Sequence, residues 1–166
     1  SSTQVVTTTS AAPIETQPEA DGALPVVVDT DLAADDIVAL AYLLSNPAVD
    51  VLAVTVSGTG EVTCPRGAEV ASGLLSTLGH DDVPVACGPE ESLSGDRVFP
   101  LSWRTLASRA YDLELTEATQ PEEEPDAVAL LTETIGASSQ PVTLLTLGPL
   151  TSIALALDAD PTLVDH

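Results

Sequence analysis

The sequence has no lysine and no methionine, and its aromatic residues are limited to one Trp, one Phe and two Tyr. A core for this chain therefore has to be built from Val, Leu, Ile and Ala side chains. No run of apolar residues is long enough to form a helix that crosses a membrane. With 166 residues, the chain is long enough for one domain with a substantial core. The composition thus predicts an aliphatic globular domain without a membrane-spanning segment.

Positive charge is almost missing, because four arginines face 26 acidic residues and the formal net charge is −22. A surface this acidic repels nucleic acids and anionic lipids, so both are excluded as partners. Two explanations of the charge stay open. The chain is either an acidic exported protein from a proteome rich in Ala and Val, or it is adapted to high salt, where counterions screen the repulsion.

The first 23 residues differ in composition from the rest of the chain. Residues 1–23 begin at Ser1 rather than Met and are rich in Ser, Thr, Ala and Pro, without a periodic apolar pattern. This composition predicts a flexible leader of the kind that follows a removed export signal, including the lipid-anchored kind. We therefore expect an exported protein that is extracellular or located in the cell envelope.

Cysteine is nearly absent as well, since only Cys64 and Cys87 are present. In an exported chain, an even pair of cysteines suggests one disulfide. Two buried thiols are the alternative.

From residue 24 onward, short apolar runs alternate with segments of helical periodicity. Strands are expected at 24–28, 50–56, 83–87 and 141–146, and helices at 35–46, 64–78, 103–110 and 127–135. Residues 147–150 lead into a last expected helix, which runs to about residue 157. This alternation, with short connections, predicts an open, mostly parallel, Rossmann-like α/β sheet flanked by helices. Because such a sheet normally continues with another strand, residues 24–166 are expected to be the N-terminal portion of a larger domain.

Four carboxylates lie close together after the first expected strand: Asp29, Asp31, Asp35 and Asp36. In an open parallel sheet, ligands bind outside the carboxyl ends of the strands. The second and fourth strands end at the same edge, in Ser57-Gly58-Thr59-Gly60 and at Thr146. A single Asp here could simply end a strand or cap a helix. The whole cluster has only oxygen ligands and almost no cations to offset it, which favours a site for Ca²⁺ or Mg²⁺ over one for zinc.

Three segments of the sequence resemble the inosine–uridine nucleoside hydrolase family. Val28–Leu40 is similar to the opening motif of the family, in which Asp-x-Asp-Pro-Gly-x-Asp-Asp joins an apolar strand to an apolar helix. Leu52–Gly60 is similar to the second strand and loop of the family, and Leu145–Ala154 to its later element Thr-x-Gly-x-Leu-Thr-Asn-Ile-Ala. The resemblance runs from about residue 24 to 166 and implies the nucleoside hydrolase fold, incomplete at its C-terminus.

This resemblance implies calcium-dependent hydrolysis of the N-glycosidic bond of ribonucleosides to ribose and free base, in purine or pyrimidine salvage. The partner would be a small-molecule nucleoside, and a homo-oligomer stays open. The family motif implies that Asp31 is the general base and also a calcium ligand. It implies two further calcium ligands, a bidentate Asp36 and the carbonyl of Thr146. Asp35 would bind a ribose hydroxyl, and Asp29 would have a supporting role.

The chain departs from the family pattern in two places. Leu32-Ala33 replaces Pro-Gly in the opening motif, and Thr59 stands where the family usually has the Asn that contacts the ribose. The last calcium-ligating Asp and the catalytic His of the family belong to its C-terminal half. His80 and His166 are not expected to replace that His.

Two other functions remain open from the residues alone. A haloacid-dehalogenase-like phosphotransferase also carries Asp-x-Asp after its first strand and binds Mg²⁺, but it needs a Lys or Arg beside the transferred phosphate. This chain has no Lys, and its four arginines are not at strand ends. The second alternative is a non-catalytic metal- or sugar-binding module that has kept the fold.

Overall fold

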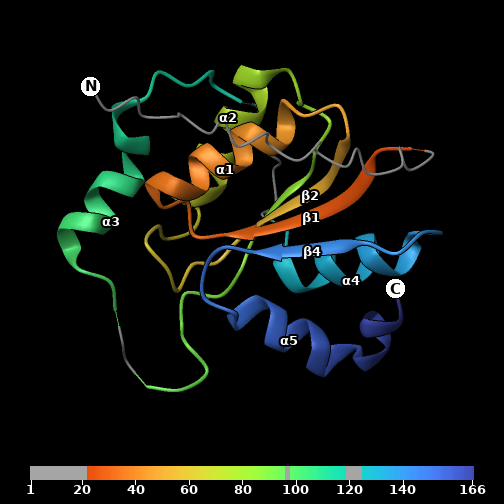
Figure 1. The fold of residues 1–166 in the computed structure, drawn as a ribbon. Coiled ribbons are helices and arrows are strands. Elements are labelled where there is room, and N and C mark those ends of the chain that lie inside the picture. The colour runs from red at the N-terminus through yellow and green to blue at the C-terminus, as the bar shows by residue number, and fades with distance from the viewer. Residues whose placement is uncertain (1–21, 96–97, 119–124) are drawn as a thin grey trace, which may run out of the picture.

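A computed structural model describes residues 22–95, 98–118 and 125–166 of the chain. The predicted leader therefore lies almost entirely outside the described residues, as does Arg97. The described strands form one parallel sheet in the order β3-β2-β1-β4. Figure 1 shows β1 between β2 and β4. Their bounds are Leu24–Thr30 for β1, Val49–Val56 for β2, Val85–Cys87 for β3 and Thr143–Thr146 for β4. The open parallel α/β sheet predicted from the sequence is confirmed.

Each helix expected from the sequence is present, with shifted ends. The α-helices are α1 (Ala34–Leu44), α2 (Arg66–Leu78), α3 (Leu101–Ser108), α4 (Ala127–Ala137) and α5 (Thr151–Ala159). The 3-10 helix η1 (Ala110–Asp112) follows α3, and the 3-10 helix η2 (Pro161–Asp165) follows α5. The expected helix over 103–110 begins earlier and breaks at Arg109, after which η1 follows. β3 is shorter than predicted because Pro84 has no N–H to donate, although its carbonyl still accepts the amide of Val54 at 3.0 Å.

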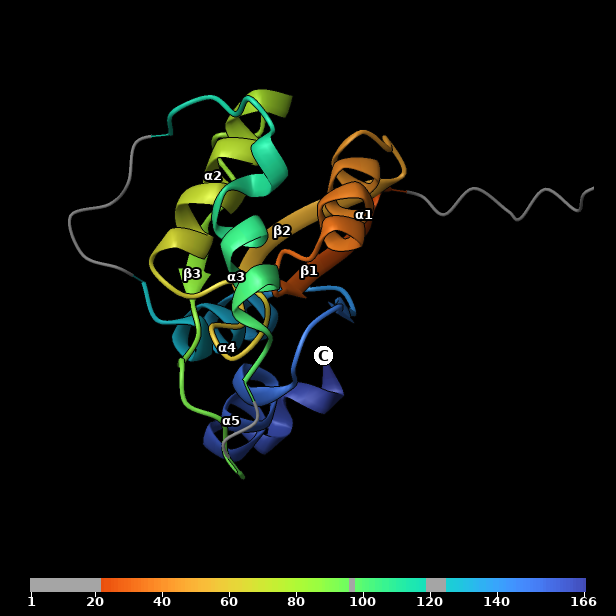
Figure 2. The same ribbon diagram turned by 90° about the vertical axis from the view of Figure 1, so that its left-hand side faces the viewer.

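The sheet is covered by helices on both faces, which makes three layers (Figure 2). Val26 and Val28 of β1 point into a core shared with α1 and α2, whereas Val27 points into a second core shared with α4 and α5. Successive side chains of a strand alternate between faces, so a strand buried on both sides reads as a continuous apolar run. This is why the run before Asp29 identified β1 so clearly.

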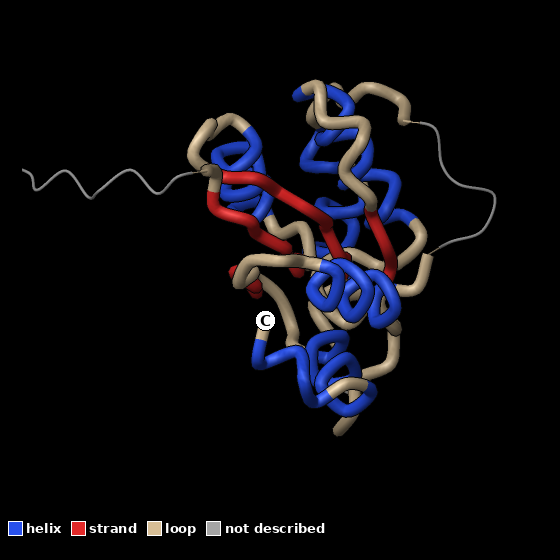
Figure 3. Tube along the Cα trace, turned by 90° about the vertical axis from the view of Figure 1, so that its right-hand side faces the viewer, coloured by secondary structure: helices blue, strands red, loops and turns tan. Residues whose placement is uncertain are grey.

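The order of the strands fixes where a ligand should bind. From β1 the chain moves outward through β2 to β3, and it then returns to place β4 on the other side of β1. The direction of winding therefore reverses between β1 and β4, and ligands of such sheets bind at the carboxyl ends of the strands at that point. Figure 3 shows the sheet from the side, between its two helical layers. None of the helices in the described ranges is both long and apolar enough to cross a membrane.

A disulfide joins Cys64, in the loop after β2, to Cys87 at the end of β3. The two Cα atoms are 5.9 Å apart, and the two residues are separated by 23 positions in the sequence. Beside the bridge, the amide of Gly88 donates to the carbonyl of Val56 at 2.7 Å. The bridge therefore links two loops that leave the carboxyl edge of the sheet.

Removing this bridge should destabilise the fold measurably. For a closed loop of this length, chain entropy predicts that Cys64→Ser combined with Cys87→Ser lowers the free energy of unfolding by about 3 kcal/mol. Urea unfolding of the oxidised wild type and of the double variant measures the difference, and reduced wild type is the control. Equal stability of all three, or two freely alkylated thiols in the native protein, would refute the bridge.

Candidate functional site at the carboxyl end of β1

Asp29 lies fully buried inside β1, between β2 and β4. It is paired in register with Thr55 of β2 and Thr146 of β4. One carboxylate oxygen, Oδ1, accepts the hydroxyl of Thr55 at 2.6 Å, whereas Oδ2 is buried without a hydrogen-bond partner. Burial raises the pKa of this carboxyl to about 6. Asp29 therefore offers one unpaired oxygen in the middle of the sheet edge.

Asp36 reaches back from the first turn of α1 to the end of β1. Its Oδ2 accepts the hydroxyl of Thr30 at 2.7 Å and the amide of Asp31 at 3.2 Å. Burial is the main reason that the pKa of the Asp36 carboxyl is raised to about 7. The N-cap of α1 is Ala33. The sequence left open that Asp35 or Asp36 simply caps the helix, but neither residue is its N-cap.

The turn between β1 and α1 is built without the family's Pro-Gly. Leu32 adopts a left-handed conformation with φ of 55°, although it is not a glycine. Such a conformation costs about 1 kcal/mol for an ordinary residue. Two contacts hold it in place: the Leu32 side chain is completely buried in the core, and its amide donates to the Thr30 hydroxyl at 2.9 Å. Backbone strain of this kind often occurs at functional sites.

Asp31 is held by three successive residues of the loop after β2. Its carbonyl accepts the amide of Val62 at 3.2 Å, and its Oδ2 accepts the amide of Glu61 at 3.0 Å. A Cβ atom at Gly60 would overlap the Asp31 side chain, and one at Gly148 would lie 2.9 Å from the Asp31 amide nitrogen. The Asp31 side chain therefore lies between two glycines, with only 4% of its surface exposed.

Gly60 and Gly148 were not predicted as site residues from the sequence. Both lie in the strand-end segments, but a sequence does not show which residue a glycine faces. Glycine in such a place often marks a close approach of another part of the chain. Here the close neighbour is the predicted catalytic carboxylate.

Thr59, the predicted ribose contact, belongs to a small cluster of buried hydroxyls. Its Oγ1 lies 3.1 Å from the Ser57 hydroxyl and 3.1 Å from the Thr151 hydroxyl. The Ser57 hydroxyl also lies 3.0 Å from the carbonyl of Pro149, to which it donates. The cluster ties the end of β2 to the start of α5, and the contact of Thr59 with ribose stays a prediction.

The structure thus gathers part of the predicted site. Asp29, Asp31 and Asp36 lie together around the end of β1, and Thr146 lies beside Asp29 at the end of β4. Asp35 is exposed in the first turn of α1 and makes no side-chain hydrogen bond within the described residues. His80 lies in the loop before β3, at the opposite edge of the sheet.

Comparison with known proteins decides the family. Residues 26–166 match the family described as inosine-uridine preferring nucleoside hydrolase. The chain belongs to this family. The resemblance seen in the sequence is thereby confirmed, and the phosphotransferase alternative is set aside.

Individual nucleoside hydrolases support the assignment. The pyrimidine-specific ribonucleoside hydrolase RihA of Escherichia coli O7:K1 is 32% identical over 142 residues, which make up 85% of this chain and 45% of that protein. A plant nucleoside hydrolase superposes with a TM-score of 0.71 at 29% identity, over 84% of this chain and 44% of that one. The inosine-uridine preferring nucleoside hydrolase of Bacillus anthracis superposes with a TM-score of 0.70 at 25% identity, over 86% of this chain and 47% of that one. The chain therefore spans about half the length of these nucleoside hydrolases.

The donor atoms at the carboxyl end of β1 suit a hard cation, although the described residues supply only part of its coordination shell. Nowhere in 22–95, 98–118 and 125–166 do three His, Cys, Asp or Glu side chains gather as a cation site. The carboxylates of Asp31 and Asp36 and the carbonyl of Thr146 are all oxygen donors. Ca²⁺ takes six to eight such ligands. A nucleoside hydrolase built on this chain would therefore need further ligands from water, substrate or residues outside this chain.

Proposed function

We propose that the full-length protein hydrolyses the N-glycosidic bond of ribonucleosides, releasing ribose and the free base, and that it depends on calcium. One observation carries the proposal. In a member of the nucleoside hydrolase family, Asp31 is held in a single orientation at the winding reversal of the sheet, next to Asp36. A carboxylate in such a fixed position is suited to take a proton from water.

Calcium would be held by Asp31, Asp36 and the carbonyl of Thr146. The unpaired buried oxygen of Asp29 supports this proposal, because a bound cation would give that oxygen a partner. Burial raises the pKa values of Asp29 and Asp36, and a nearby cation would favour the ionised form of both carboxyls. Two of the arginines, Arg66 and Arg109, are paired with acidic residues elsewhere. When bound, calcium supplies positive charge that orients the ribose hydroxyls and lowers the pKa of a water.

Residues of this chain would activate the water and bind the ribose. Asp31 presents Oδ2 to the Glu61 amide, and its other carboxylate oxygen accepts a proton from the attacking water. Asp35, exposed at the start of α1, binds a ribose hydroxyl, and Thr59 adds a second contact. As the base leaves, positive charge develops on the sugar, and the acidic edge stabilises that charge more than it stabilises the neutral substrate. Direct attack by water inverts the anomeric carbon.

The products test the proposal. The full-length protein is incubated with inosine, uridine and adenosine, with calcium and after chelation, and ribose and free base are measured together. We expect equal amounts of both products from at least one nucleoside, with calcium required. Calcium binding without turnover of any nucleoside would instead favour the non-catalytic binding module.

We also propose that the protein is exported and works outside the cell or in the cell envelope. The composition of residues 1–23, rich in Ser and Thr, and the disulfide support this proposal, because disulfides persist in oxidising compartments. Fractionation of the native host tests it, and the proposal fails if the protein is recovered with the cytoplasm.

Asp36→Asn should abolish the gain in melting temperature that calcium gives the full-length wild type. The amide keeps an acceptor for Thr30 and for the Asp31 amide but loses the charge that attracts the cation. Thermal unfolding with and without calcium measures the effect, and Asp50→Asn, an exposed site at the start of β2, is the control. An unchanged calcium shift in Asp36→Asn would contradict the site.

The same variant should change how stability depends on pH when calcium is removed. The pKa of Asp36 is raised to about 7 in the folded protein, so folding favours its protonated form. The contribution of this protonation to the free energy of unfolding is fully present below roughly pH 4, and it is lost as the pH rises through 7. Wild type should therefore lose more melting temperature than Asp36→Asn between pH 4 and 8. Parallel curves would show that Asp36 is not the group responsible.

A further inference from the structure

Tyr111 connects a distant segment of the chain to the loop that holds Asp31. Its hydroxyl donates to Oε2 of Glu61 at 2.9 Å, across 50 positions of sequence. The backbone amide of the same Glu61 donates to Oδ2 of Asp31. Burial, together with the neighbouring Glu61 carboxylate, raises the pKa of the Tyr111 hydroxyl, which keeps it protonated as a donor. Two hydrogen bonds thus run in series from Tyr111 to the predicted catalytic carboxylate.

The backbone that carries Tyr111 is unusual. Ala110, Tyr111 and Asp112 all have positive φ, between 49° and 62°, and none of them is a glycine. Each such residue costs about 1 kcal/mol or more relative to an ordinary conformation. The turn buries Ala110 in the core shared with α1 and α2, and it packs Tyr111 against that core. It also brings the Tyr111 hydroxyl to Glu61.

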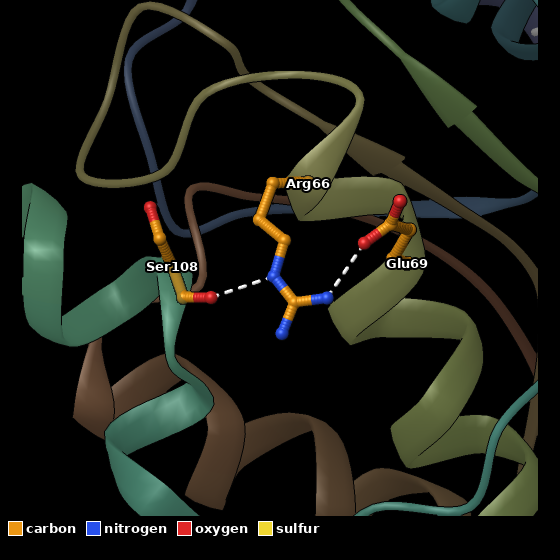
Figure 4. A network of polar contacts seen from close by, with 3 residues as sticks. All are labelled: Arg66, Glu69 and Ser108. Atoms are coloured by element: carbon orange, nitrogen blue, oxygen red, sulfur yellow. Dashed lines mark hydrogen bonds and ion pairs between the residues drawn. The ribbon is translucent and has the colours of Figure 1, made fainter.

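Two of the four arginines hold this strained turn on either side. Arg66, at the start of α2, donates from Nε to the carbonyl of Ser108 at 2.6 Å and pairs with Glu69 at 2.6 Å (Figure 4). Arg109 pairs with Asp112 across the turn itself. In a chain with so few cations, half of them fix the segment that presents Tyr111.

We propose that Tyr111 and Glu61 are positioning residues for Asp31: the Tyr111 hydroxyl holds the Glu61 side chain, which keeps the Glu61 amide on one oxygen of Asp31. In the proposed reaction, the second oxygen of Asp31 accepts the proton from water. The effect of these two residues on catalysis rests on the proposed hydrolysis. The contacts from Tyr111 through Glu61 to Asp31, which we call the brace, are a property of the fold and can be measured without turnover.

Hydrogen exchange at the Glu61 amide tests the brace directly. In the full-length protein, Tyr111→Phe keeps the ring but removes the hydroxyl, and it should speed exchange of the Glu61 amide about tenfold, as expected for local opening. Tyr42→Phe is the matched control, because Tyr42 is exposed on α1 and makes no side-chain hydrogen bond within the described residues. Unchanged exchange in Tyr111→Phe would overturn the proposal, whether or not the wild type hydrolyses nucleosides.

Kinetics test the consequence. Because a small misplacement of a catalytic group is costly, Tyr111→Phe and Glu61→Ala should each lower kcat about tenfold or more while KM changes less than about threefold. Glu61→Gln keeps the acceptor oxygen and should recover most of the loss seen in Glu61→Ala. The combined Tyr111→Phe and Glu61→Ala variant should be no slower than the worse single variant, because both break the same chain of contacts.

Three results would overturn the positioning role: wild-type kcat in Tyr111→Phe, losses that multiply in the double variant, or no recovery in Glu61→Gln. A wild type without any turnover would refute the proposed hydrolysis, and the exchange measurement would still decide the brace.

Discussion

Asp31→Asn should lower kcat of the full-length protein on its best nucleoside by about two to four orders of magnitude, the usual contribution of a general base. Asn has the shape of Asp and can still accept the Glu61 amide, so the fold around the site should survive. It cannot take a proton from water, and it attracts a cation less strongly. Steady-state kinetics with saturating calcium measure the loss.

Asp50→Asn is the control for this prediction, because Asp50 is exposed at the start of β2, far along the strand from the site. It should leave kcat within about twofold of wild type, as expected for a surface change. If Asp31→Asn retained most of the wild-type rate, another residue would have to be the base.

Gly60→Ala should be nearly as damaging, although it adds only a methyl group. That methyl would overlap the Asp31 side chain, so either Asp31 or the loop has to move. Overpacking of this kind typically costs about 1–3 kcal/mol of stability. Displacement of Asp31 should also lower kcat about a hundredfold, the effect of moving a catalytic group by roughly 1 Å.

Gly136→Ala is the matched control, because a Cβ atom there would meet nothing within 4 Å. Gly136 lies inside α4, where Ala is preferred over Gly, so this variant should be neutral or slightly stabilising. If Gly60→Ala behaved like Gly136→Ala in both melting temperature and kcat, the close contact between Gly60 and Asp31 would have no part in catalysis.

Local patterns allowed much of the fold to be predicted from the sequence. The apolar run that ends at Asp29 identified a strand buried on both faces, and the spacing after Asp35 identified α1. Strand ends in a parallel sheet share one edge, and this rule alone predicted that Asp29, Asp31 and Thr146 lie near one another. The bounds of α3 and β3 were wrong by a few residues, where Arg109 and Pro84 interrupt the regular pattern.

The rest of the site depends on contacts between distant positions. Gly60 faces Asp31 across the sheet edge, and Tyr111 reaches Glu61 over 50 positions. Neither contact leaves a local pattern, because the residues involved are ordinary in their own segments. The left-handed turn over 110–112 was equally hidden, since it contains none of the glycines that usually mark such turns.

The anomeric form of the released ribose tests the proposed role of Asp31 most directly. If Asp31 activates a water that attacks the sugar without a covalent intermediate, the configuration at the anomeric carbon should invert. Proton NMR during rapid turnover of a β-ribonucleoside by the calcium-loaded, full-length protein should therefore show α-ribofuranose first, before the anomers equilibrate. Initial release of the β anomer, or no release of ribose at all, would contradict this role.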